Sequence, residues 1–171
     1  MFKIGDKVSH PNFGVGAIEK IEEKNILGKK QQYYILKLSI NEMILMIPVN
    51  RAKEIGLRHI IDRKTVPEVL NVLGDKVDKE MRENYKQRIK TQSEMVDSGD
   101  LLKVAQVVKN YTYLKRKDKL STTEKGLLER AQKILESEIS AACNIEKNKV
   151  KFLIKEAVDR EVVSETKRKN H

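Results

Sequence analysis

Apolar positions in the first fifty residues fall in short runs, which are separated by turns containing Gly, Asn or Pro. The runs 33–38 and 43–49 are rich in aromatic and aliphatic residues, a composition typical of strands. The predicted strands are 7–10, 15–21, 33–38 and 43–49, with a turn at 11–14 and a hairpin loop at 25–30. Short strands at this close spacing favour a small β-barrel of the SH3 or Tudor kind.

The apolar period becomes helical after Gly56, where hydrophobic residues recur every three or four positions. About five helices are predicted, with a break at 98–100. The first helix begins at a capping box, Thr65-Val66-Pro67-Glu68, and stops at Gly74; the second runs from about Lys79 to Val96. Asp100 caps the third helix, the capping box Ser121-Thr122-Thr123-Glu124 begins the fourth, and Asn144 caps the fifth. These signals predict an all-α bundle after the barrel.

The two periods predict an α+β chain of two modules, a Tudor/SH3-like barrel at 1–56 and a helical domain at 57–163. Residues 164–171 are expected to form a frayed basic tail. No apolar run approaches the 18 residues of a membrane span, and the first residues lack the core of a signal peptide. We therefore expect a cytoplasmic protein with no membrane partner.

Charge adds a prediction about the partner. The 171 residues carry 35 Lys+Arg against 25 Asp+Glu, a net +10. Residues 1–56 hold nine basic and six acidic side chains, and residues 57–171 hold 26 and 19, so the excess is +3 in the first module and +7 in the second. Nucleic acid is the commonest acidic partner of such a chain. The alternative is a lysine-rich protein whose charge serves only solubility.

Candidate catalytic and metal-binding groups are sparse. The three histidines, His10, His59 and His171, do not pair at metal-ligand spacing, and Cys143 stands alone in a small-residue patch. Gly14-Val15-Gly16 lacks the Gly-Lys-Ser/Thr end of a phosphate-binding loop, so a barrel turn explains it better. We therefore expect no enzymatic activity, no cofactor and no metal site.

The predicted second helix combines an apolar stripe with a basic one. The apolar stripe consists of Met81, Tyr85, Ile89, Gln92 and Val96, and the basic stripe of Lys79, Arg82, Lys86 and Lys90. A basic stripe could follow a phosphate backbone, but it is also what an ordinary solvated helix face looks like. By pattern alone Tyr85 belongs to the packing side.

The sequence resembles the CarD/CdnL family of bacterial transcription regulators over nearly its whole length. The matching motifs are Phe2-x-Ile4-Gly5-Asp6-Lys7-Val8, His10-Pro11-Asn12-Phe13-Gly14-Val15-Gly16-x-Ile18, Tyr34-Ile35-Leu36, Ile47-Pro48-Val49, Gly56-Leu57-Arg58, Ser98-Gly99-Asp100, Val104-Ala105-x-Val107-Val108, Leu120-Ser121-x-x-Glu124-Lys125 and Ala131-x-x-Ile134-Leu135-x-x-Glu138. The first half alone would also resemble the polymerase-binding module of transcription-repair coupling factors, but no helicase motors follow it.

The resemblance implies two partners, the RNA polymerase β subunit and promoter DNA. In this family the Tudor-like module docks on the β subunit, and here its contacts would be Lys24, Ile44, Met46 and Pro48. The helical module lies on promoter DNA at the upstream edge of the opening bubble. The outcome in the family is a stabilised open promoter complex, which implies a nucleoid-associated protein. We expect the free protein to be a monomer.

In the family an aromatic residue, usually Trp, acts as a wedge in the DNA minor groove, and neighbouring basic residues hold phosphates. The DNA-binding residues implied here are Tyr85, Lys86, Arg88, Lys90 and Lys125. This chain has no Trp, and Tyr85 stands at the wedge position with a smaller ring. The family's Arg-Arg pair is reduced to Gln87-Arg88, and Met46 stands where some relatives carry Arg.

The pattern and the resemblance give different predictions for Tyr85. The helical wheel places its side chain among the buried residues, whereas the family resemblance implies that it is exposed to DNA. Both hold if Tyr85 lies near the start of its helix, and Asp78 could cap a late start. We therefore expect exposure. Two other functions stay open from the sequence: a Tudor-like nucleic-acid-binding protein without polymerase contact, and a protein-interaction adaptor.

Overall fold

The computed structural model describes residues 1–82 and 84–169, with side chains except those of residues 80, 82 and 161–169. The chain divides into two compact units, Met1–Ile60 and the residues from Ile61 onward. Each has its own hydrophobic core. No helix in the described part of the chain is long and apolar enough to cross a membrane.

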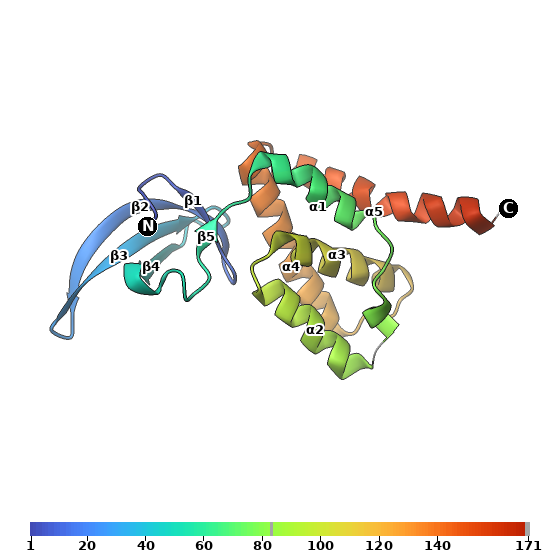
Figure 1. The fold of residues 1–171 in the computed structure, drawn as a ribbon, viewed down its shortest axis with the longest axis horizontal. Helices are drawn as coiled ribbons and strands as arrows, with labels where there is room; N and C mark the ends of the chain where they lie inside the picture. Colours follow the sequence, from blue (N-terminus) through green and yellow to red (C-terminus); the bar gives the residue numbers. More distant parts are fainter. Residues whose placement is uncertain (83, 170–171) are drawn as a thin grey trace. The chain divides into compact units, whose positions relative to one another are not determined.

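The first unit is an antiparallel five-stranded sheet, drawn in blue and cyan in Figure 1. Its strands are β1 (Lys7–His10), β2 (Gly14–Ile26), β3 (Lys29–Leu38), β4 (Ile44–Pro48) and β5 (Arg58–His59), in the spatial order β4-β3-β2-β1-β5. A short 3₁₀ helix, η1 (Val49–Arg51), follows β4. The predicted Tudor-like β module is confirmed.

The hairpin that joins β2 to β3 is longer than predicted. Residues 25–30 were expected to form its loop, but pairing continues to Ile26 opposite Lys29. Only Leu27 and Gly28 lie outside the strands, with φ angles of 53° and 77°. Two residues with positive φ form the tight turn whose twist matches that of the flanking strands, so the ladder runs to the tip.

The core of the first unit lies under one face of the sheet. Tyr34, Leu36, Ile18 and Val8 are almost fully buried in it. Gly16 lies where β2 and β3 come closest, since a Cβ atom there would sit 2.6 Å from the Lys37 carbonyl oxygen and 2.7 Å from a Leu36 methyl group. The Gly14-Val15-Gly16 motif therefore serves close strand packing.

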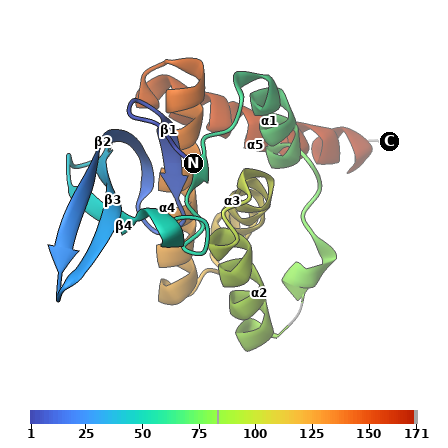
Figure 2. The same ribbon diagram turned by 60° about the vertical axis from the view of Figure 1, so that its left-hand side comes forward.

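The second unit is helical (Figure 2). Its elements are η2 (Arg63–Thr65), α1 (Val66–Leu73), η3 (Lys79–Arg82), α2 (Tyr85–Asp97), α3 (Leu101–Arg116), α4 (Thr122–Cys143) and α5 (Lys147–Lys169). Helix α3 packs against α1, α2 and α4, and nine of its sixteen residues are buried, so it is the central helix. The predicted helical module is confirmed.

Several helix ends match the sequence signals and others do not. Asp100 caps α3, and Ser121 and Glu124 form the predicted capping box of α4. The capping box predicted at Thr65 does not form, because Asp62 caps a 3₁₀ turn that leads directly into α1. Asn144 was expected to start the fifth helix. It instead ends α4 in the left-handed conformation that Asn tolerates at a helix C-terminus.

The boundary between the units lies four residues later than predicted. Strand β5 follows Gly56 and pairs with β1 through Val8–His59 and Ser9–Arg58, so residues 57–60 belong to the sheet unit. A two-residue strand is too short to show a period, which is why the sequence pattern did not reveal it. Residues 164–169 of the expected frayed tail are helical, and residues 170–171 lie outside the described part.

Candidate functional site

One face of the sheet brings together the four side chains predicted to contact polymerase. The register pairs Lys24 with Gln31 across β2 and β3, and it pairs Pro48, Met46 and Ile44 with Tyr33, Ile35 and Lys37 across β3 and β4. Directly opposed residues of an antiparallel pair project to the same side. Lys24, Ile44, Met46 and Pro48 therefore share the face away from the core, which we call the outer face.

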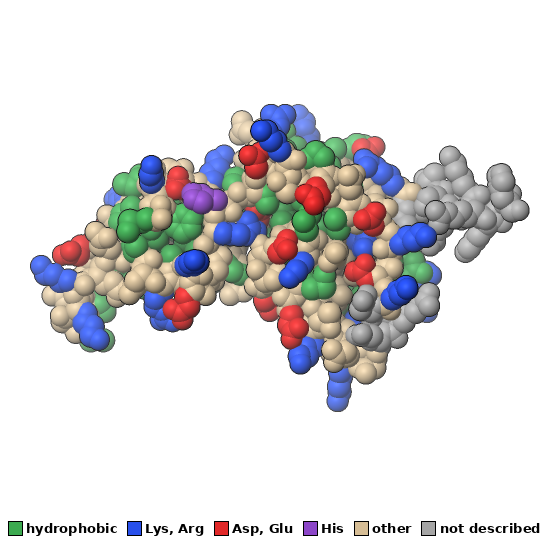
Figure 3. Space-filling model, in the orientation of Figure 1, with side chains coloured by type: hydrophobic (Ala, Val, Ile, Leu, Met, Phe, Trp, Pro, Cys, Tyr) green, Lys and Arg blue, Asp and Glu red, His purple; other side chains and the backbone are tan. Residues whose placement is uncertain are grey.

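The outer face is apolar at its β4 edge. Ile44 is 58% exposed and Met46 is 44% exposed, whereas Ile47 on the opposite face is 4% exposed. Figure 3 shows hydrophobic side chains reaching the surface of the sheet unit between scattered charges. In the described chain β4 pairs with β3 only, so its other edge is available for strand addition. Both the apolar face and the open edge suit a protein partner.

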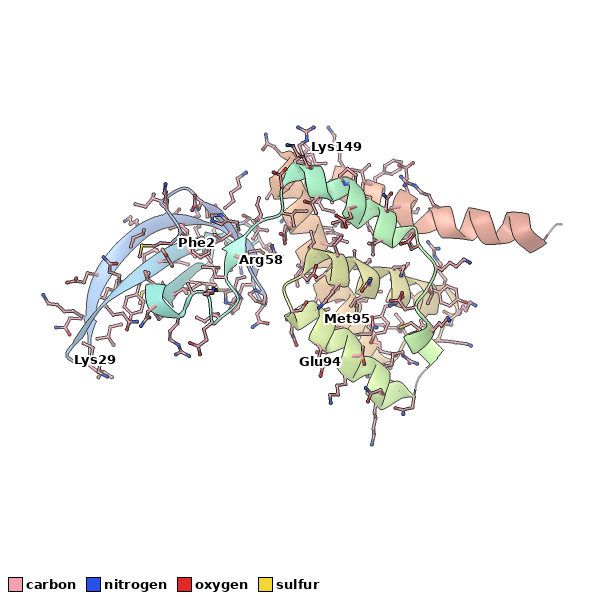
Figure 4. The ribbon with its side chains drawn as sticks, viewed as in Figure 1. Phe2, Lys29, Arg58, Glu94, Met95 and Lys149 are labelled. Carbon is pink, nitrogen blue, oxygen red and sulfur yellow. The ribbon has the colours of Figure 1, made fainter. Side chains whose placement is uncertain are left out.

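Lys24 has a nearby carboxylate on the same face. Its Nζ lies 3.5 Å from the Glu22 carboxylate, and both side chains are 39% exposed. An ion pair this exposed contributes little to stability. Lys29 marks the tip of the same hairpin in Figure 4, beyond the Lys24–Glu22 pair. The hairpin thus presents charge of both signs next to the apolar edge.

Helix α2 starts at Tyr85, six residues later than the predicted start at Lys79. Asn84 caps it, with its side-chain oxygen accepting a hydrogen bond from the Gln87 amide at 3.0 Å. Asp78 is not the cap, because its carboxylate binds Lys109 Nζ and Asn110 Nδ2 on α3, each at 2.8 Å. The predicted basic stripe is therefore broken. Lys79 lies in η3, while Lys86 and Lys90 lie on α2; the Arg82 side chain is outside the described set.

Tyr85 is 46% exposed at the first residue of α2. Further along the same side of the helix, Gln92 and Val96 are buried against the core. Tyr85 therefore lies on the packing side, as the wheel predicts, but it is exposed because the packing stripe is uncovered in the first turn of the helix. Figure 4 labels Glu94 and Met95 at the other end of α2. The position leaves the ring accessible to a ligand.

Arg88 and Glu124 form a buried ion pair that fastens this first turn. The Arg88 guanidinium donates to Glu124 at 2.7 Å, and the two side chains are 15% and 0% exposed. Glu124 also accepts hydrogen bonds from the Ser121 amide at 3.0 Å and the Ser121 hydroxyl at 2.9 Å. The pair thus joins the first turn of α2 to the capping box of α4.

The electrostatics of this pair favour the charged form of Glu124. Burial acts to raise the pKa of Glu124, but the hydrogen bonds from Ser121 and Arg88 outweigh it and hold the pKa below its ordinary value. The Tyr111 hydroxyl is buried nearby, with no hydrogen-bond partner among the described residues. Burial, and then the charge of Glu124, raise the pKa of Tyr111 and keep it neutral.

The five predicted DNA-binding residues separate into three groups. Tyr85 and Arg88 are neighbours on α2, with the guanidinium carbon 6.0 Å from the ring centroid. Lys125 is exposed next to Glu124 in the first turn of α4, on the segment that the ion pair joins to α2. Lys86 and Lys90 are exposed one turn apart on the flank of α2. Arg88 differs from the lysines, because its charge is already engaged inside the protein.

Glu124 is the residue that the sequence argument missed. Its spacing from Ser121 identified it as a capping residue. Nothing local indicated that it is fully buried or that its charge partner is Arg88, 36 residues earlier. The signal available was a lone Arg at the start of a helix and a Glu in a capping box.

The histidines and the cysteine of the described chain have ordinary surroundings. His10 is buried, its Nδ1 accepts from the Asn12 amide at 3.1 Å, and burial lowers its pKa. His59 is exposed, and its ring centroid lies 4.9 Å from that of Phe2. Cys143 is half-buried at the end of α4. Among the described residues there is no cluster of three or more His, Cys, Asp or Glu that could hold a metal ion.

Two family models match the two units in turn. Residues 2–61 match the family model of the CarD-like/TRCF RID domain, and residues 68–155 match that of the CarD C-terminal domain. The chain is 31% identical over 151 residues to YdeB of Bacillus subtilis (strain 168), a protein provisionally named a transcription factor, covering 88% of this chain and 98% of that one. It is also similar to the solved structure CdnLNt from Myxococcus xanthus, with 43% identity, 36% of this chain and 86% of that chain covered, and a TM-score of 0.31.

Proposed function

The chain belongs to the CarD/CdnL family of transcription-related, RNA-polymerase-interacting regulators, and from that premise we propose that it stabilises the open promoter complex. The outer face of the sheet binds the polymerase β subunit. The first turn of α2, with Tyr85 at its tip, binds promoter DNA at the edge of the bubble. Proteins of this family are generally not enzymes, and the proposed mechanism needs only binding.

The observation that carries the proposal is the exposed Tyr85 ring at the start of α2. A large aromatic side chain that projects from a fixed helix end can stack on a base. Such stacking contributes about 1–3 kcal/mol per base. The Arg88–Glu124 ion pair supports this role, because it holds the turn that carries the ring. The flanking Lys86 and Lys90 supply phosphate attraction that is independent of sequence.

The sheet unit supports the other half of the proposal. An apolar stripe at an open strand edge, next to a basic side chain at Lys24, fits a protein partner better than a nucleic acid. Main-chain hydrogen bonds from an added strand would supply affinity, and Ile44 and Met46 would supply apolar contacts. The two units then address different partners at the same promoter.

Stabilisation follows if the protein binds the open complex better than the closed one. A ligand shifts an equilibrium only by its differential affinity for the two states. Inserting a ring between base steps costs a few kcal/mol of stacking in closed duplex. Bases at the bubble edge are already unstacked, so Tyr85 gains its stacking energy there without that cost.

The test is the lifetime of open complexes formed by the cognate polymerase, with and without the full-length protein. The protein should lengthen the lifetime, and Tyr85→Ala should remove most of that effect while binding to the β subunit is retained. Met46→Glu should remove the effect through lost β-subunit binding. A lifetime that the wild-type protein leaves unchanged would exclude the proposed function.

A further inference from the structure

A basic cavity of about 650 Å³ lies in the helical unit, between the 76–81 segment and the C-terminal end of α3. Its charged lining consists of Lys76, Lys79, Arg88, Lys117, Lys119 and Asp78. We propose that this cavity binds a small phosphorylated ligand, a nucleotide that carries two or more phosphates. The proposal goes beyond the open-complex function, and the cavity shares only Arg88 with the turn that carries Tyr85.

Among its described lining residues, the cavity holds an excess of positive charge. Asp78 is its only described carboxylate, and Lys109 and Asn110 already bind both of its oxygens at 2.8 Å. Within the described part of the chain, no carboxylate forms an ion pair with Lys76, Lys79, Lys117 or Lys119. Several lysines that converge on one hollow repel one another unless an anion joins them. A single phosphate, with a charge of about −1.5 to −2, would balance at most half of the charge of these four lysines, so the favoured ligand has several phosphates.

The walls of the cavity are prearranged. The Asp78 amide donates to Asn110 at 3.2 Å in addition to the two carboxylate contacts, so the segment that carries Lys76 and Lys79 is tied to α3. On the other side the amides of Lys117 and Lys119 both donate to the Leu114 carbonyl, at 3.1 and 3.0 Å. Binding therefore requires little ordering of the backbone, which favours affinity.

Apolar and aromatic groups complete the lining. Met81, Leu114 and Val77 contribute to the wall, and Tyr113 contributes a ring. The Lys117 ammonium lies 4.1 Å from the centroid of the Tyr113 ring and also contacts its hydroxyl. A volume of about 650 Å³ is within the range of about 300–1,000 Å³ typical of small-molecule sites. The combination of cations, an aromatic ring and apolar surface fits a nucleotide better than an inorganic ion.

The hollow shape argues against a DNA duplex as the occupant. A duplex is a convex rod whose phosphates meet exposed side chains such as Lys86 and Lys90, whereas a concave cavity encloses a compact ligand. Single-stranded DNA contains the same chemistry of base and phosphate. The experiment therefore has to distinguish a free nucleotide from single-stranded DNA as the ligand of the cavity.

The experiment is isothermal titration of the full-length protein, in the absence of polymerase and promoter, with ATP, GTP, AMP, adenosine and pyrophosphate as probes. We expect the triphosphates to bind at least tenfold more tightly than AMP, and adenosine to show no binding. The double variant Lys117→Gln/Lys119→Gln should lose at least tenfold in affinity for the triphosphates. Tyr113→Leu should lower the affinity for nucleotides and leave the affinity for pyrophosphate unchanged.

A matched control removes the same charge elsewhere. Lys103 and Lys155 are exposed on α3 and α5 and lie outside the cavity. Lys103→Gln/Lys155→Gln should bind the triphosphates within twofold of wild type. Equal losses in the two double variants would reduce the effect to net charge and overturn the proposal.

A parallel titration measures the binding of a short single-stranded DNA to the same proteins. If the wild-type protein binds no free nucleotide and Lys117→Gln/Lys119→Gln weakens only the DNA, the cavity belongs to the DNA surface and the proposal is wrong. Nucleotide binding that survives in Tyr85→Ala, a variant aimed at the open-complex function, would support a separate site. Unchanged thermal unfolding of each variant shows that lost binding is local.

Discussion

The outer face of the sheet and the first turn of α2 present exposed apolar side chains in different ways. Ile44 and Met46 are placed by strand register, and their side chains are 58% and 44% exposed. Tyr85 is placed by a helix end that depends on the buried Arg88–Glu124 pair. Substitutions on the outer face should therefore change binding alone, whereas substitutions around Tyr85 can change binding and stability together.

The largest effect is expected at Arg88, where a substitution changes both binding and stability. Arg88→Ala leaves the fully buried Glu124 without its charge partner, and breaking a buried pair in this way costs about 3–5 kcal/mol. We expect a loss toward the lower end, because Ser121 still donates two hydrogen bonds to the carboxylate. Chemical denaturation measures it, with the neighbouring exposed Lys86→Ala as the control. Equal stability of the two variants would mean that the pair does not fasten α2.

Tyr85→Ala tests the ring without touching the pair. We expect the open-complex lifetime to fall by the value of one base stack, about 1–3 kcal/mol or roughly fivefold to more than a hundredfold. The free energy of unfolding should stay within about 0.5 kcal/mol of wild type, as for other exposed positions. Tyr85→Trp should lengthen the lifetime because the larger ring covers more base surface. A drop of several degrees in the melting temperature of Tyr85→Ala would instead identify Tyr85 as a core residue.

Met46→Glu tests the outer face. A charge in the middle of the apolar edge should weaken binding to the polymerase β subunit by at least tenfold, about 1.4 kcal/mol. Stability should be unchanged because the side chain is exposed. Ile4→Glu makes the same change of charge at another exposed position of the sheet unit and should bind normally. A pull-down with purified β subunit measures both, and normal binding by Met46→Glu would move the contact to another surface.

The pH dependence of stability reports on Glu124. Its pKa is lower in the folded protein than the ordinary 4.5. The stability that this carboxylate contributes is therefore complete above about pH 4.5 and is lost as the pH falls through the folded-state pKa. Melting temperatures between pH 6 and pH 3 should fall less steeply in Glu124→Gln than in wild type. If the melting temperatures of the two proteins fell equally with pH, Glu124 would not be a source of the loss of stability in acid.

The smallest effect is expected from the lysines on the flank of α2. Lys86→Ala and Lys90→Ala should each weaken DNA binding about equally on different sequences. Each should also reduce the magnitude of the salt slope by about one. Arg88 is left out of this comparison, because its removal should lower the free energy of unfolding as well as remove a charge. An unchanged salt slope in the double variant would place the phosphate contacts elsewhere, for example near Lys125.

Much of the fold could be predicted because it depends on local patterns. The switch from alternating to helical periodicity separated the two units, and Asp100 and Ser121 marked true helix starts. Predictions failed where two local signals competed. Thr65 was predicted to cap α1, but Asp62 caps the 3₁₀ turn that leads into α1, and the Thr65 side chain makes no capping hydrogen bond. The family resemblance supplied the candidate site residues. A late helix start correctly predicted that Tyr85 is exposed, but the partners of the site residues could not be read from spacing.

The sequence by itself determined most of the strands and helices, because side-chain periodicity and capping act over a few residues. Only the tertiary structure decided where α2 begins and what Arg88 does. Asp78 could have capped the helix, but Lys109 and Asn110 bind its carboxylate from 31 and 32 residues away, so Asn84 takes that place. Arg88 could have been a solvated phosphate ligand, but Glu124 meets it from another helix. Both outcomes depend on a competition between local and long-range partners, which is settled only when the helices pack.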